Sequence, residues 1–223
     1  MFEIGKVHYN DVVPVIQSGQ VIKKKRERAI FYAPGNIFIK IWVPNWTQGD
    51  ITKFALDQGY YHQNNVTSLT ALIFDETGER GYIQNGGETA EISPGDKSWE
   101  KFNDNVPIEQ RYQFILDLFD CGLRVGGTYS DLAPSNIIFY QNKVNLIDLE
   151  SFRSFDLIFE RKCQPYEKFD LEAWWKPHET AKRDTDKFYR AYLTECLDIN
   201  LDFSIDSVDN FQKARQIIKD QSL

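Results

Sequence analysis

The chain has 223 residues, of which 42% are hydrophobic and 14% aromatic, and its formal net charge is -7. This length and composition are sufficient for one large domain or two small lobes with a buried core, and they exclude an intrinsically disordered chain. A net negative charge of this size gives no general attraction to nucleic acid or to an anionic membrane surface.

The N-terminal residues 1–10 mix acidic and basic side chains without an apolar run, so we expect no secretory signal. No stretch approaches the roughly 18–20 apolar residues that a membrane span needs, so no integral membrane segment is expected. The three cysteines are widely spaced and odd in number, which fits neither a disulfide framework nor a zinc site. These features predict a cytoplasmic protein without a nucleic-acid partner, and they leave its oligomeric state open.

The first ninety residues predict mostly strands. Residues Ala33–Asn36 form a strong Pro-Gly turn signal between two apolar runs, and Asp75–Gly78 separate two further runs. A helix is expected between these two hairpins, with Asp50 as its N-cap. The predicted strands are 12–17, 21–24, 29–32, 36–42, 67–74 and 80–84, and the predicted helix is 50–61.

The second half predicts mostly helices. Residues 88–105 are polar and contain Pro and Gly, so we interpret them as a linker between an N-terminal lobe (1–87) and a C-terminal lobe (106–223). Pro107 begins a helix with one apolar stripe, which Gly122 is expected to end. The remaining predicted elements are strands at 137–140 and 144–148 and helices at about 179–197 and 207–219.

The most informative stretch runs from Tyr129 to Glu150. Asp131 is followed five residues later by Asn136, then by an apolar strand, a tight turn and a second strand that ends at Asp148. Phosphoryl transfer requires an acceptor hydroxyl placed in line and a phosphate whose charge magnesium neutralises. Carboxylate and amide oxygens are the ligands that suit this ion. An ordinary structural role remains open for all three residues, because Asp and Asn are also frequent turn and cap residues.

This stretch resembles the catalytic loop and metal-binding motif of the protein-kinase-like superfamily, H-R-D-L-x-x-x-N followed by D-F-G. The resemblance implies that Asp131 is the catalytic Asp, and that Asn136 and Asp148 bind magnesium. Two positions depart from the pattern: Tyr129 stands where the family has His, and Leu149-Glu150 replace Phe-Gly. The second departure is similar to aminoglycoside- and choline-type small-molecule kinases, and it makes Glu150 an auxiliary metal ligand.

The same resemblance assigns nucleotide contacts in the N-terminal part. The run from Asn36 to Trp42 resembles the family's V-A-I-K strand, which implies that Lys40 contacts the ATP phosphates. Asp57 is the best candidate for the acidic partner of this lysine. Gln84 and Asn85 fall where the family grips adenine through backbone groups. No G-x-G-x-x-G precedes Lys40, so either 18–20 or the basic run 23–28 is expected to cover the phosphates.

These expectations define a two-lobed α+β fold, with an N-terminal antiparallel sheet plus one helix and a mainly helical C-terminal lobe. The implied activity is the transfer of the γ-phosphate of ATP, with Mg²⁺, to a hydroxyl of a small molecule, glycan or lipid-linked sugar. No A-P-E follows Glu150, and only about seventy residues remain, which favours a small-molecule kinase. A compact atypical protein kinase, a nucleotide-binding pseudokinase and an unrelated α+β binding domain remain open alternatives.

Overall fold

The structure is a computed structural model of the whole chain. It describes residues 5–18, 20–24, 28–33, 37–42, 66–85, 98–140, 142–147, 149–160 and 171–222. No helix within these ranges is long and apolar enough to cross a lipid bilayer. The predicted helix at 50–61 lies outside the described residues.

Six strands in the first 85 residues form one sheet with the order β1-β5-β6-β4-β3-β2. Neighbouring strands are antiparallel except β1, which pairs in parallel with β5. The expected antiparallel sheet is therefore a mixed one, because β1 adds an edge strand that the sequence did not predict. The strands are β1 (Gly5–His8), β2 (Gln20–Lys24), β3 (Arg28–Ala33), β4 (Ile37–Trp42), β5 (Leu69–Asp75) and β6 (Gly78–Asn85).

The predicted strand at 12–17 is wrong, because helix α1 (Tyr9–Ser18) occupies this part of the chain. Its β-branched composition favours a strand, but packing against the sheet decides the conformation. Val12 is buried in a small apolar cluster with Ile39, Ile41 and Ile73 from the central strands. Helix α1 therefore covers one face of the sheet, and it leaves the opposite face, which carries Lys40, for other contacts.

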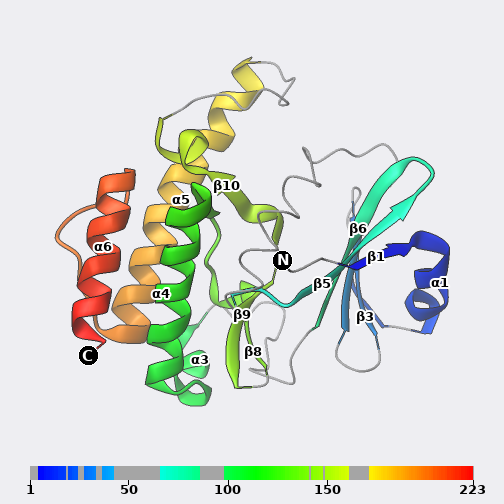
Figure 1. The fold of residues 1–223 in the computed structure, drawn as a ribbon, viewed down its shortest axis with the longest axis horizontal. Helices are drawn as coiled ribbons and strands as arrows, with labels where there is room; N and C mark the ends of the chain where they lie inside the picture. Colours follow the sequence, from blue (N-terminus) through cyan, green and yellow to red (C-terminus); the bar gives the residue numbers. More distant parts are fainter. Residues whose placement is uncertain are drawn as a thin grey trace.

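The described helices after residue 98 lie on the far side of the molecule from α1, where α4, α5 and α6 run side by side (Figure 1). Their buried residues form one continuous core with Leu72 and Tyr82 from the sheet. This core joins the sheet and the helices into a mixed α+β structure. The helices are α3 (Trp99–Asn105), α4 (Ile108–Val125), α5 (Leu171–Leu197) and α6 (Val208–Gln221).

Two boundaries in this region differ from the predictions. The range assigned to a linker includes α3, which Ser98 caps and whose Trp99 and Phe102 are buried. Helix α4 continues past Gly122 to Val125 and ends at Gly126, whose φ of 74° is left-handed. Gly122 instead permits close packing, because a Cβ there would lie 3.2 Å from the Phe211 ring.

Two short strand pairs follow the helix α4 in the sequence. One of them, the β8–β9 hairpin, lies between the sheet and the helices in Figure 1. β8 (Ile137–Tyr140) pairs with β9 (Lys143–Leu146), as predicted apart from the earlier end of β9. β7 (Gly127–Tyr129) pairs with β10 (Phe152–Ser154), so the chain returns to the base of the Asp131 loop after the hairpin. The turn between β8 and β9 contains Asn142 with a φ of 61°, a conformation that Asn tolerates.

Candidate active site

The loop that carries Asp131 is fixed at both ends. At its start, the backbone N–H and the hydroxyl of Ser130 both donate to the carbonyl of Ser151, each at 3.0 Å. Leu132 is fully buried in the main core, whereas Asp131 is half-buried. At its end, a 3₁₀ turn (η1, Pro134–Asn136) leads directly into β8. The apolar anchor and the turn thus hold Asp131 in a short loop at the edge of the core.

Asn136 connects this loop to the strand that precedes Asp148. Its side chain is buried, and its Nδ2 donates to the backbone carbonyl of Asp131 at 3.1 Å. Its own carbonyl accepts a hydrogen bond of 2.8 Å from the backbone N–H of Ile147. Because Nδ2 is used inside the protein, the side-chain oxygen of Asn136 is the atom suited to a magnesium ion.

The backbone on both sides of Asp148 is fixed by contacts from different parts of the chain. Leu146 N–H donates to the Val66 carbonyl at 2.7 Å, and Gln84 Nε2 donates to the Leu146 carbonyl at 3.2 Å. After Asp148, the Leu149 N–H donates to the hydroxyl of Tyr82 at 3.3 Å. Leu146 and Leu149 are therefore attached to the sheet, and Ile147 is attached to the Asp131 loop. Asp148 itself and the side chain of Glu150 lie outside the described residues, although Glu150 belongs to a 3₁₀ turn (η2, Leu149–Ser151).

Lys40 lies on the sheet face that contacts this segment. Its side chain is only 4% exposed, and it pairs across β4 and β6 with Tyr82. The Lys40 ammonium lies over the Tyr82 ring at 5.8 Å from the centroid. Lys40 therefore contacts the same tyrosine whose hydroxyl holds Leu149. The predicted acidic partner, Asp57, lies outside the described residues.

Gln84 and Asn85, the predicted adenine contacts, already have partners inside the protein. The Gln84 side chain is buried and bonds to Leu146, as described above. The Asn85 N–H donates to the Ser68 carbonyl at 3.1 Å, and the Asn85 carbonyl accepts from the Ser68 hydroxyl at 2.6 Å. In this structure Gln84 connects the sheet to β9, a role that the sequence did not predict.

No group of three or more His, Cys, Asp or Glu side chains suited to a metal ion occurs among the described residues. Asp148 and the Glu150 side chain, two of the three predicted ligands, are not among them. The remaining one, Asn136, presents an oxygen, which fits a hard cation such as Mg²⁺ and not a thiol- or imidazole-binding metal. The residues that can be described are compatible with the predicted ion.

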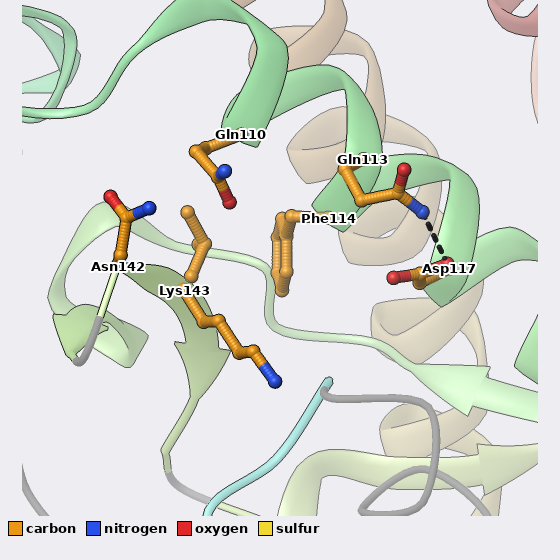
Figure 2. Close-up of a pocket in the computed structure, with 7 residues that line it drawn as sticks. Gln110, Gln113, Phe114, Asp117, Asn142 and Lys143 are labelled. Carbon is orange, nitrogen blue, oxygen red and sulfur yellow. Dashed lines mark hydrogen bonds between the residues drawn. The ribbon is translucent and has the colours of Figure 1, made fainter.

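A separate groove of about 320 Å³ lies between α4 and the β8–β9 turn, and its lining does not include Lys40. Figure 2 shows side chains of α4 on one wall and those of Asn142 and Lys143 on the other. Gln113 Nε2 donates to one oxygen of Asp117 at 2.8 Å. Burial raises the pKa of Asp117 to about 6, because it disfavours the charged carboxylate, and the nearby Asp120 adds to this effect.

No protein-family model and no curated protein sequence matches this chain. The functional assignment therefore depends on the motif and on the contacts around Lys40, Asp131, Asn136 and residues 146–149.

Proposed function

We propose that the protein is an ATP-dependent phosphotransferase with a two-lobed, kinase-like architecture. One observation carries the proposal: the neighbours of Asp148 in the sequence are bonded to two different parts of the chain. Leu146 and Leu149 are bonded to the sheet through Gln84 and Tyr82, and Ile147 is bonded to the Asp131 loop through Asn136. The sheet also contributes Lys40 at this place. These contacts join the strand of Lys40, the Asp131 loop and the neighbours of Asp148, which supports the single reaction centre that phosphoryl transfer requires.

The proposed roles follow from the chemistry of each side chain. Asp131, half-buried near the start of its loop, accepts the proton of the acceptor hydroxyl while the oxygen attacks the γ-phosphorus of ATP and ADP leaves. Asn136, Asp148 and Glu150 would hold Mg²⁺, which neutralises charge on the phosphates. Lys40 contributes a positive charge on the other side of the site, with Asp57 as its proposed carboxylate partner.

The acceptor is proposed to be a hydroxyl of a small molecule, a glycan or a lipid-linked sugar. The sequence supports this choice over a protein substrate, because no A-P-E motif follows Glu150. The described helices after residue 160 also have a structural role, since Tyr189, Tyr192 and Phe211 of α5 and α6 are fully buried in the core.

Calorimetric titration with ATP, in the presence and absence of Mg²⁺, tests the proposal. We expect binding that magnesium strengthens, and we expect Asn136→Ala to reduce this magnesium effect because it removes an oxygen ligand. Asn145→Ala is a matched control, since Asn145 is also buried and its side-chain Nδ2 donates to the nearby Lys143 carbonyl. No binding, or equal affinity with and without magnesium, would contradict the proposed function.

A further inference from the structure

Tyr82 contacts two separate parts of the proposed site. It lies on the central strand β6, and only 2% of its surface is exposed. Its ring lies beneath the ammonium of Lys40, 5.8 Å from Nζ to the centroid. Its hydroxyl accepts the hydrogen bond from the Leu149 N–H at 3.3 Å. One rigid side chain therefore relates the position of Lys40 to the residue that follows Asp148.

The Tyr82 ring stabilises the buried side chain of Lys40. Burying an ammonium costs free energy unless the charge is compensated, and an aromatic face provides part of this compensation. The attraction is stronger at a desolvated site, and Lys40 is 4% exposed. The ring of Tyr82 thus attracts the Lys40 ammonium and keeps it on the face directed toward β9.

The Tyr82 hydroxyl holds the backbone directly after Asp148, through its contact with Leu149. Leu149 is fully buried, so its N–H requires an acceptor inside the protein, and the Tyr82 hydroxyl is that acceptor. On the other side of Asp148, the Ile147 N–H is held by the carbonyl of Asn136. The Asp131 loop therefore fixes one neighbour of Asp148, and Tyr82 fixes the other.

We propose that Tyr82 is a positioning residue for phosphoryl transfer: its ring orients Lys40, and its hydroxyl fixes the backbone at Leu149, the residue directly after Asp148. This inference rests on the proposed function and extends it to a side chain that neither binds the metal nor transfers a proton. A tyrosine that only fills the core would contribute to stability but would not affect how the protein uses magnesium.

Tyr82→Phe separates these two roles, because it keeps the ring beneath Lys40 and removes only the hydroxyl. We expect the Mg²⁺ concentration needed for half-maximal ATP binding to rise about tenfold, the equilibrium equivalent of one buried hydrogen bond. ATP binding without magnesium should stay at the parental level, since the contact with Lys40 remains. Tyr82→Leu removes both contacts and should weaken ATP binding with and without magnesium.

Tyr192→Phe is the matched control. Tyr192 is also fully buried, and its hydroxyl donates to the Arg111 carbonyl at 3.0 Å within the helical part. It should lose comparable stability with no change in the magnesium requirement. A parental magnesium requirement in Tyr82→Phe, or an equal rise in both Tyr→Phe variants, would overturn the positioning role and leave the proposed function standing. A parent protein that binds no nucleotide would overturn the proposed function, and the role of Tyr82 with it.

Discussion

Gly81→Ala tests the packing that brings Lys40 to the site. Gly81 lies on β6 opposite Ile41 of β4, with a φ of 156° that side chains rarely adopt. An added Cβ would lie 1.9 Å from the Lys40 carbonyl oxygen and 2.9 Å from its carbonyl carbon. Ordinary contact requires more than 3 Å, so β4 and β6 must separate by more than an ångström at Lys40.

The magnitude has two contributions. A strained backbone conformation costs about 1–3 kcal/mol, and overpacking adds about 1–3 kcal/mol. We therefore expect Gly81→Ala to lower the free energy of unfolding by about 2–6 kcal/mol. Gly78→Ala isolates the first contribution, because its φ is 119° but no atom lies within 4 Å of the added Cβ. It should cost about 1–3 kcal/mol, less than Gly81→Ala by the overpacking contribution.

Urea denaturation of both variants, followed by circular dichroism, measures the difference. A second readout is ATP binding, which should fall in Gly81→Ala because Lys40 moves with its strand, and should persist in Gly78→Ala at the distant hairpin turn. If Gly81→Ala is no less stable than Gly78→Ala, β4 and β6 do not approach each other as closely at Gly81 as they do in this structure. The described position of Lys40 would then also be wrong.

Two further predictions concern groups outside the proposed site. The pKa of Asp117 is raised from 3.8 to about 6, so the folded state binds this proton more tightly than the unfolded state does. The bound proton's contribution to the free energy of unfolding is complete below about pH 4, and it is lost as the pH rises through 6. Asp117→Asn should thus match the parent at pH 4 and be more stable at pH 8. The pKa shift alone corresponds to about 3 kcal/mol of unfolding free energy, which solvent screening at the open groove reduces to about 1 kcal/mol. Urea denaturation of the parent and Asp117→Asn at pH 4 and pH 8 measures this difference. Equal stability of the two proteins at pH 8 would contradict the burial of this carboxylate. Burial also raises the pKa of the Cys121 thiol to about 12 and that of Cys196 well above its usual range. Both should resist a thiol reagent at pH 8 until the protein unfolds, as mass spectrometry of the modified peptides would show; rapid labelling of the native protein would refute this.

Local sequence signals predicted several elements correctly. The β3–β4 and β5–β6 hairpins follow from turn residues between apolar runs, and Gly78 has the positive φ that such a turn uses. Pro107 marks the start of α4 because its missing N–H is harmless at this position. In these cases the residues near each other in sequence determine the structure.

The errors arise where distant packing decides. The β-branched residues around Val12 favour a strand, yet contacts with Ile39 and Ile73 make this segment a helix. Glycine is a common residue at helix ends, which led to the wrong boundary at Gly122. In the structure Gly122 lies inside α4, where the nearby Phe211 ring favours a residue without a side chain. Trp99 and Phe102 in the predicted linker were signals of burial that the surrounding polar residues obscured.

The candidate site was predictable in part. Asp131 and Asn136 are recognisable because their spacing is local, and the structure connects them by a hydrogen bond. The contacts of Gln84 and Tyr82 with β9 join strands from distant parts of the sequence, so no spacing reveals them. Strand alternation could have indicated Tyr82 as a site residue, since Tyr82 on β6 lies directly opposite Lys40 on the neighbouring strand β4.

The most direct test of the central claim compares ATP hydrolysis and ATP binding in the parent, Asp131→Asn and Asp148→Ala, with saturating Mg²⁺ and no acceptor. A positioned general base contributes about 10²–10⁴-fold, so Asp131→Asn should lose hydrolysis by that factor while it binds ATP nearly as well as the parent. Asp148→Ala should lose both binding and hydrolysis, because in the proposed mechanism Asp148 acts on the phosphates through the metal. A parent without hydrolysis, or an Asp131→Asn variant that hydrolyses ATP at the parental rate, would contradict the account.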